Sequence, residues 1–365
     1  MNILLSVLAS LLGVFVLLWA LGLWFRRGED LRVYDHPVDP PASELFSRLG
    51  GPSGEHQAVT QMFESQKDEV RGLSKSQMLT FVRNFMEEIP AGKEYNCRFD
   101  PVDVDGVPAE WVLAPGVDGL RRVLYIHGGA FFAGSPRSHR PITSRYSELA
   151  NAAVLAIDYR LMPENHRLDC VEDCRTAYKW ILENGPEGPG HATRVFISGD
   201  SAGGNLSLVL SNWIRDEQLS KPDAVIALSP LTDSTYSGPS IRDNVKTDKM
   251  LGPLFGRLTK VPRWLLGWIY VLETRVRPAN PLVSPIHARL SGLPPTLIQV
   301  SEAEMLLDDA RRFVNKARSF GSPARIQTWP GLLHVWQIFY PEVPEAREAF
   351  DRIGEFLESV ESGYK

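Results

Sequence analysis

The sequence has few cysteines. Cys97, Cys170 and Cys174 are the three in 365 residues, and this odd, sparse set excludes the dense disulfide framework of small secreted domains. Cys170 and Cys174 lie four residues apart on a predicted helix, but no cluster of His or Cys accompanies them to complete a tetrahedral metal site. All three are therefore expected to be small core residues, and no metal is implied.

An excess of charge of either sign is also lacking. The formal net charge is -5, and the chain contains no long basic run. No field is available to attract a polyanion, so nucleic acid is not expected as a partner. Hydrophobic residues make up 44% and charged residues 23% of the chain, which is an ordinary balance for a folded globular protein with one large body.

Charged residues are absent from Ile3 to Phe25. At about 1.5 Å per residue, a helix of this length crosses a hydrocarbon core roughly 30 Å thick. A cleaved signal peptide is the alternative, but it requires a positive start and small residues before the cut, and Ala20 and Gly22 are a poor cleavage pair. The sequence predicts an uncleaved, single-pass membrane anchor over residues 1–28, with residues 3–25 in the membrane.

The charges that flank the apolar stretch predict its orientation. Arg26, Arg27 and Arg32 follow it, whereas only the α-amino group precedes it. Because positive flanks remain on the cytoplasmic side, the folded body after the anchor is expected in the cytoplasm.

After the anchor, residues 29–92 contain turn signals and two amphipathic helical patterns, at 59–70 and 76–88, which predict a linker and N-terminal cap helices. In residues 93–365, short apolar runs alternate with helical patterns, which predicts a mostly parallel central sheet covered by helices on both faces. The expected strands lie at 110–113, 122–126, 153–159, 194–198, 224–228, 296–300 and 325–329.

This alternation stops at about 234–281, where an insertion contains the strongly apolar stretch 261–272. Such a stretch fits the roof of a substrate pocket or a helix packed in the core. The sequence leaves both interpretations open.

A G-x-S-x-G motif occupies residues 199–203, directly after a predicted strand and before a helical pattern. This is the context of the nucleophile elbow in the α/β-hydrolase fold, where a sharp turn projects the serine hydroxyl. Ser201 is therefore the predicted nucleophile. Side chains at 199 and 203 would collide in so sharp a turn, and the Ala202 N–H points to where negative charge develops.

A glycine-rich loop, 127–134, follows the strand predicted at 122–126. Glycines allow the backbone to approach a substrate, so the amides of Gly128, Gly129 and Ala130 are candidate donors to an oxyanion. His127 begins this loop, and we expect it to brace the loop and not to act as a base.

In an α/β hydrolase the nucleophile is followed in the chain by an acid and then by a histidine. Among eight histidines, His334 alone follows the last predicted strand after Ser201 and is the predicted base. The acid stays open at this stage. Its candidates lie together after the strand at 296–300 and are Glu302, Glu304, Asp308 and Asp309.

Three motifs in this order, the loop from His127, the run 158–164 and the sequence 199–205, resemble the hormone-sensitive lipase family of esterases, also called the GDXG group. The similarity spans about residues 105 to 358. By this resemblance Glu304 is the catalytic acid and Asp308 a supporting carboxylate. It also implies supporting roles for Asp158, Tyr159, Arg160 and Asp200. Ala130 replaces a third glycine of that family's loop.

The resemblance and the motifs together predict a membrane-anchored serine carboxylesterase that hydrolyses esters of short to medium acyl chains through an acyl-enzyme, with no cofactor. A lipase or deacetylase directed at lipids is the alternative with the same chemistry. A non-catalytic receptor for small molecules is the alternative of another class, because the family includes hormone-binding members that lack the histidine.

Overall fold

The computed structural model describes residues 2–66, 69–70 and 72–363, in which nine strands form one sheet in the order β1-β11-β10-β9-β8-β4-β5-β3-β2. The first seven strands in this order are parallel to one another. The last two are not: β3 is antiparallel to β5, and β2 is antiparallel to β3. The bounds of the strands are β1 (Ser43–Leu45), β2 (Arg98–Val104), β3 (Val107–Leu113), β4 (Asp118–Ile126), β5 (Ala152–Ile157), β8 (Arg194–Asp200), β9 (Ala224–Leu228), β10 (Thr296–Ser301) and β11 (Ala324–Trp329), with a separate small pair β6 (Asn184–Gly185) and β7 (Gly188–Pro189).

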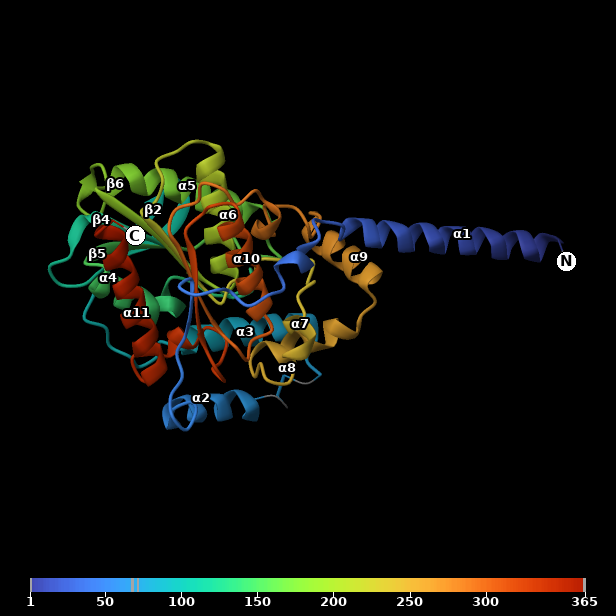
Figure 1. Ribbon diagram of the computed structural model, residues 1–365, viewed down its shortest axis with the longest axis horizontal. Coiled ribbons are helices and arrows are strands. Elements are labelled where there is room, and N and C mark those ends of the chain that lie inside the picture. Colours follow the sequence, from blue (N-terminus) through green and yellow to red (C-terminus); the bar gives the residue numbers. More distant parts are fainter. Residues whose placement is uncertain (1, 67–68, 71, 364–365) are drawn as a thin grey trace.

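Helices cover both faces of this mostly parallel sheet, as predicted (Figure 1). Helices α5, α6 and α10 pack on one face and α4 and α11 on the other. The helices are α1 (Asn2–Phe25), α2 (Gly54–Ser65), α3 (Lys75–Glu88), α4 (Arg140–Leu149), α5 (Asp169–Glu183), α6 (Ala202–Asp216), α7 (Ser240–Asp243), α8 (Leu251–Phe255), α9 (Arg263–Thr274), α10 (Leu307–Ser319) and α11 (Pro344–Glu361).

The central strands are apolar because both of their faces are covered. Every residue of β5, β9 and β10 is buried, which explains their nearly continuous Val, Leu, Ile and Ala runs. All seven predicted strands are present, although β5 ends at Ile157 instead of 159. Two strands of this sheet were missed, as was the small pair β6–β7. Strand β1 has three residues at one edge, and β2, at the other edge, contains Pro101 and has mixed polarity. Cys170 and Cys174 are buried in the core, as expected.

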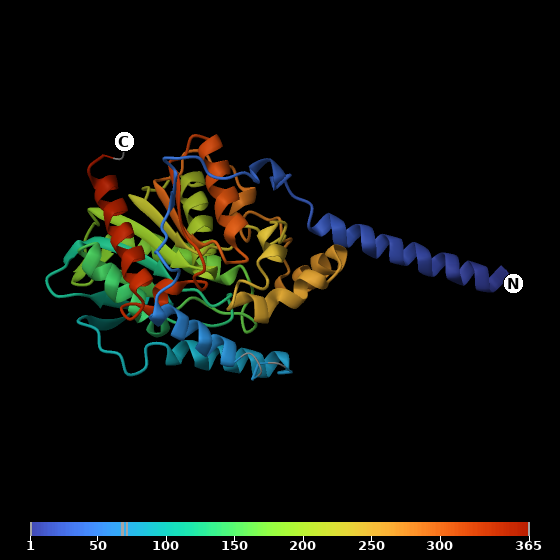
Figure 2. The same cartoon turned by 60° about the horizontal axis from the view of Figure 1, so that its bottom comes forward.

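Helices α2, α3, α7, α8 and α9, called here the cap helices, gather beside one end of the sheet (Figures 1 and 2). The predicted segment 76–88 matches α3, whereas 59–70 extends past the end of α2 into residues 67–68, which lie outside the described residues. The Arg83 side chain of α3 donates to the carbonyl oxygens of Phe132 and Met162 and pairs with Glu164. The Arg83 guanidinium thus joins α3 to the glycine-rich loop.

Helix α1 projects from the body as a long apolar rod (Figure 1). Within the described residues, Ile3–Phe25 is the one helical stretch long and apolar enough to cross a membrane, and a signal sequence would have the same properties. The last turns of α1 pack on α9, where Gly22 and Gly267 allow close contact. A Cβ atom on Gly22 would lie 2.2 Å from the Trp264 carbonyl oxygen, and one on Gly267 would lie 2.2 Å from that of Gly22.

The segment after α1 is fastened to the body. Asp35 accepts hydrogen bonds from the Arg312 side chain, and the Asn315 amide donates to the Tyr34 carbonyl oxygen at 3.1 Å. Lys316 pairs with Glu29 nearby. Residues 29–36 therefore form an ordered strap along α10.

Candidate active site

Ser201 lies in a strained turn between β8 and α6, with φ 50° and ψ −111°. Only small neighbours fit this turn. A Cβ on Gly199 would lie 2.5 Å from the Gly203 carbonyl oxygen, and one on Gly203 would lie 1.9 Å from that of Ile126. Such strain persists only where the surroundings impose it, and here it presents the serine hydroxyl at the carboxyl edge of the sheet.

Gly203→Ala is expected to destabilise the protein by about 3 kcal/mol or more, because the clash is with backbone atoms that cannot rotate away. We expect a fall in Tm of at least about 5 °C in thermal unfolding. Gly354→Ala, on α11, is the matched control. A Cβ atom at residue 354 would meet nothing within 4 Å, and alanine favours a helix more than glycine does. A Gly203→Ala protein that unfolds at the wild-type temperature would contradict the packing of this turn.

Three side chains from distant parts of the chain meet at this edge. The Ser201 hydroxyl lies 2.8 Å from His334 Nε2, and His334 Nδ1 lies 2.6 Å from Glu304 Oε2. Because an ionised carboxylate only accepts, Nδ1 carries the proton and Nε2 is free to accept one from the serine. His334 and Glu304 are buried, and Ser201 remains partly accessible.

Glu304 is held in place by two further donors. Its Oε1 accepts from the Ser229 hydroxyl at 2.8 Å and from the Ser301 amide at 2.7 Å. Burial lowers the pKa of His334, but the adjacent Glu304 carboxylate outweighs burial and holds that pKa above its ordinary value. Ser229 was missed from the sequence, although it directly follows β9 at the same edge of the sheet.

Of the four acidic candidates, Glu304 is the one within hydrogen-bonding reach of His334 in the described part of the chain. Asp309 accepts from the amides of Thr232 and Asp233, and Glu302 lies 3.7 Å from Arg311. Asp308, expected to support the acid, instead accepts from the Ser240 amide at 2.6 Å on α7. Asp308 therefore holds the cap helix α7, and the side chain that supports Glu304 is Ser229.

The glycine-rich loop differs from the prediction at its first glycine. The Gly128 amide donates to Asp200 Oδ1 at 2.9 Å and is already occupied. In the regions described, the amides of Gly129, Ala130 and Ala202 have no protein acceptor. Gly129 has φ 109° and Ala130 φ 55°, so Ala130 adopts the left-handed conformation in place of a third glycine. These three amides are thus unoccupied among the described residues, whereas that of Gly128 is not.

The buried Asp200 carboxylate holds the glycine-rich loop in place through hydrogen bonds. Besides Gly128, it accepts from the Tyr125 hydroxyl at 2.6 Å, and His139 Nε2 lies 3.3 Å away. Burial acts to raise the pKa of Asp200, but the pairing with His139 and the Tyr125 hydrogen bond outweigh it, and the pKa is lowered. Tyr125 and His139 were not predicted from the sequence, because only folding brings them to Asp200.

His127 braces the loop through its ring. It stacks on Tyr159 with 4.2 Å between ring centroids, and the Tyr159 hydroxyl donates to the His127 carbonyl oxygen at 2.8 Å. Burial, assisted by His139, lowers the pKa of His127 to about 3 and keeps the ring neutral.

The neighbours of Tyr159 do not share this role. The Arg160 side chain pairs with Asp173 at 2.7 Å, and the Asp158 amide donates to the Pro108 carbonyl oxygen at 2.8 Å. No hydrogen bond joins either residue to the loop within the described residues. The support expected from this run comes instead from Tyr159 and from the Met162 amide, which donates to the Phe131 carbonyl oxygen at 2.8 Å.

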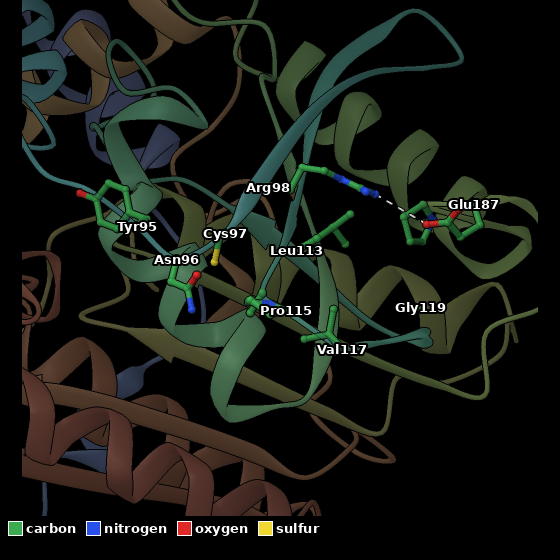
Figure 3. Close-up of a pocket in the computed structure, with 12 residues that line it drawn as sticks. Tyr95, Asn96, Cys97, Arg98, Leu113, Pro115, Val117, Gly119 and Glu187 are labelled. Atoms are coloured by element: carbon green, nitrogen blue, oxygen red, sulfur yellow. Dashed lines mark ion pairs between the residues drawn. The ribbon is translucent and has the colours of Figure 1, made fainter.

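A hollow of about 490 Å³ lies elsewhere, lined by Tyr95–Arg98, Leu113–Val117, Gly119, Pro186 and Glu187 (Figure 3). It surrounds the turn before β4, whereas Ser201 follows the carboxyl end of the parallel strand β8. The hollow therefore lies at the opposite edge of the sheet from the three aligned side chains.

Comparison with known proteins identifies the family of the chain. A family model with the description alpha/beta hydrolase fold, Abhydrolase_3, matches residues 123–338. An acetyl-hydrolase of Streptomyces hygroscopicus is 39% identical over 262 residues, which cover 72% of this chain and 83% of that protein. The carboxylesterase/phospholipase LipF of Mycobacterium tuberculosis is 35% identical over 266 residues, covering 70% of this chain and 68% of the relative.

Solved structures agree with the sequence relatives. The crystal structure of an esterase from the bacterial hormone-sensitive lipase family superposes with a TM-score of 0.72 at 34% identity, covering 84% of this chain and 98% of that one. A second hormone-sensitive lipase structure, from a metagenome library, gives a TM-score of 0.72 at 28% identity, with 84% and 98% covered.

Proposed function

Because this chain belongs to the Abhydrolase_3 family of α/β hydrolases and is a carboxylesterase of the hormone-sensitive lipase family, we propose that Ser201 is its nucleophile, His334 its general base and Glu304 the acid that orients the base. The observation that carries this assignment is the unbroken hydrogen-bonded series from Ser201 through His334 to Glu304. Such a series recurs on unrelated folds and is recognised by its geometry.

In the proposed reaction, His334 Nε2 accepts the Ser201 proton as the hydroxyl oxygen attacks the ester carbonyl. The amides of Gly129, Ala130 and Ala202 stabilise the oxyanion of the tetrahedral intermediate. His334 then returns the proton to the departing alcohol, which leaves an acyl-enzyme on Ser201. Water attacks this ester by the same route, releases the carboxylic acid and restores the serine.

The proposed base predicts the pH dependence of the reaction. His334 must be neutral to accept a proton, and Glu304 holds its pKa above the ordinary 6.5. We therefore expect kcat/KM for p-nitrophenyl acetate to fall as the pH drops through an apparent pKa above 6.5. Rates measured at constant ionic strength test this, and an acidic limb centred below that value would contradict the pairing.

The proposed substrates are esters of short to medium acyl chains. The names acetyl-hydrolase and carboxylesterase/phospholipase, given to two relatives, span the two alternatives. A series of p-nitrophenyl esters from acetate to palmitate separates them. A maximum of kcat/KM at short or medium chains supports the proposal, whereas a maximum at the longest chains supports a lipid-directed enzyme.

We further propose that α1 is retained as a single-pass anchor. The contact of Gly22 with α9, and a 3.0 Å hydrogen bond from the Arg277 side chain to the Trp24 carbonyl oxygen, support this reading, because a cleaved signal would remove both. The body is proposed to lie in the cytoplasm because Arg26 and Arg27 follow the apolar span.

Mass spectrometry of the purified protein and protease treatment of sealed membrane vesicles test these two proposals. We expect a mass that includes residues 3–25, and a body digested in vesicles that expose the cytoplasmic face. A mature protein without these residues refutes the anchor, whereas digestion confined to vesicles that expose the outer face reverses the orientation.

A further inference from the structure

We propose that the outward face of α9 is a second membrane-contact surface, seated in the headgroup region of an anionic bilayer beside the end of α1, so that the active site takes its ester from the bilayer. The proposal rests on the α1 anchor proposed above. It assigns a specific occupant, a lipid surface, to a helix face that the described residues leave partly exposed.

Helix α9 has one face toward α1, one toward the body of the protein and one toward the outside. Trp264 and Trp268 face α1: the Trp264 ring meets Phe15 with 5.8 Å between centroids, and Trp268 Nε1 donates to the Leu18 carbonyl oxygen at 2.8 Å. Gly267 and Thr274 are its two buried residues, so α9 is not a core helix.

The third face is apolar and points outward. Leu265, Ile269 and Leu272 are spaced four and three residues apart and share one side of the helix. Leu272 is 71% exposed and Leu265 37%, while Ile269 between them is half-buried. Outward apolar residues on a short helix are typical of helices that lie in the plane of a membrane interface.

The contact with α1 sets the depth of this face. The backbones of the two helices approach at Gly22, three residues or about 5 Å before Phe25, the last residue of the apolar span. From there the two tryptophan side chains of α9 reach back toward the hydrocarbon, to Phe15 and Leu18. Both views show α9 against the end of α1 nearest the body, not along its free half (Figures 1 and 2). If α1 spans the bilayer, α9 lies at the boundary between hydrocarbon and headgroups.

Charge around α9 fits an anionic surface. Exposed cations that have no carboxylate partner in the described regions surround it at both ends: Arg27, Arg257, Lys260, Arg263 and Arg275. Clusters of basic residues beside an apolar face are attracted to anionic lipid headgroups. The chain as a whole has a net charge of -5, so this cluster is local.

The inner side of α9 leads to the catalytic loop. The Tyr270 hydroxyl interacts with Ser234 and with Arg167. The Arg167 guanidinium lies 3.6 Å from the ring centroid of Phe131, which follows Ala130 in the glycine-rich loop. A helix that touches lipid outside and is linked through Arg167 to the catalytic loop inside is suited to pass an ester from the bilayer to Ser201.

The first test measures the position of α9. With Cys97 replaced by Ser, Leu272→Cys is spin-labelled in the full-length protein reconstituted into phosphatidylcholine vesicles containing phosphatidylglycerol. We expect the label to be relaxed by oxygen dissolved in the lipid and protected from an aqueous nickel complex. Leu120→Cys, 48% exposed at the start of β4, is the water-facing control.

The second test measures the consequence for catalysis. Leu272→Glu is expected to lower kcat/KM about tenfold for a long-chain 4-methylumbelliferyl ester dissolved in the vesicles. Its activity on p-nitrophenyl acetate in water stays within about twofold of wild type, because Leu272 does not touch the catalytic residues. Leu120→Glu is expected to leave both activities unchanged.

The outcomes distinguish this proposal from the anchor. A label at 272 that is as accessible to nickel as the label at 120, in protein that still sediments with the vesicles, overturns the α9 surface and leaves the anchor intact. Protein that remains in the supernatant refutes the anchor and the α9 surface together. Equal loss of both activities in Leu272→Glu also counts against delivery from the bilayer, because it marks general damage.

Discussion

Ser201→Ala is expected to lower kcat for p-nitrophenyl butyrate by about 10⁵- to 10⁶-fold, because covalent catalysis through the serine oxygen is lost and only the oxyanion donors and substrate binding remain. Alanine removes a single oxygen at a position where the backbone is already strained, so the fold is expected to persist. Rates should be measured with circular dichroism and Tm on the same preparation.

Ser211→Ala is the matched control for this substitution. Ser211 lies on α6, its hydroxyl is buried, and it has no hydrogen-bond partner in the described residues. It should retain wild-type activity. A fluorophosphonate reagent should label the wild type and Ser211→Ala on residue 201. If Ser201→Ala keeps more than about one hundredth of the activity, or if the reagent labels another residue, Ser201 is not the nucleophile.

Glu304→Gln is expected to lower kcat by about 10³- to 10⁴-fold, because a neutral amide no longer stabilises the imidazolium or fixes its tautomer. The substitution also predicts a change in pH dependence. With the Glu304 charge removed, burial lowers the pKa of His334 against only the smaller effects of Asp248 and Asp200, so the acidic limb of the residual kcat/KM should move to lower pH. A change that merely damaged the fold would not produce this shift.

Asp308→Asn tests the alternative acid. An Asn oxygen can still accept from the Ser240 amide, so stability should be preserved and kcat should remain within about threefold of wild type. If Asp308→Asn loses as much activity as Glu304→Gln, the two carboxylates act together and the assignment of Glu304 as the single acid is wrong.

The parts of the site that follow from chain order were predictable. The elbow at Ser201 has a local context, a strand before it and a helix after it, and His334 follows the final strand. Both signals depend only on the order of residues along the chain, so they can be read from the sequence. The assignment of Glu304 among four neighbouring acids needed the family resemblance, because residues on one turn differ only in direction, and direction is set by packing.

What could not be predicted depends on contacts between distant segments. The Gly128 amide was expected to bind substrate, but it is 72 residues away from the Asp200 carboxylate that occupies it. Arg83, Tyr125 and Ser229 act through partners in other elements and leave no local pattern. The short edge strand β1 lacks any periodic signal. The division of the chain at residues 28 and 92 stays a prediction.

The strap at residues 29–36 has a practical consequence for producing a soluble form. A truncation made after residue 36 would deprive Arg312 and Lys316 of α10 of their carboxylate partners in the strap. A truncation before residue 29 keeps those pairs but uncovers Trp264, Gly267 and Trp268, which α1 shields. Either shortened protein would tend to aggregate, so polar replacements at 264 and 268 should accompany the removal of α1.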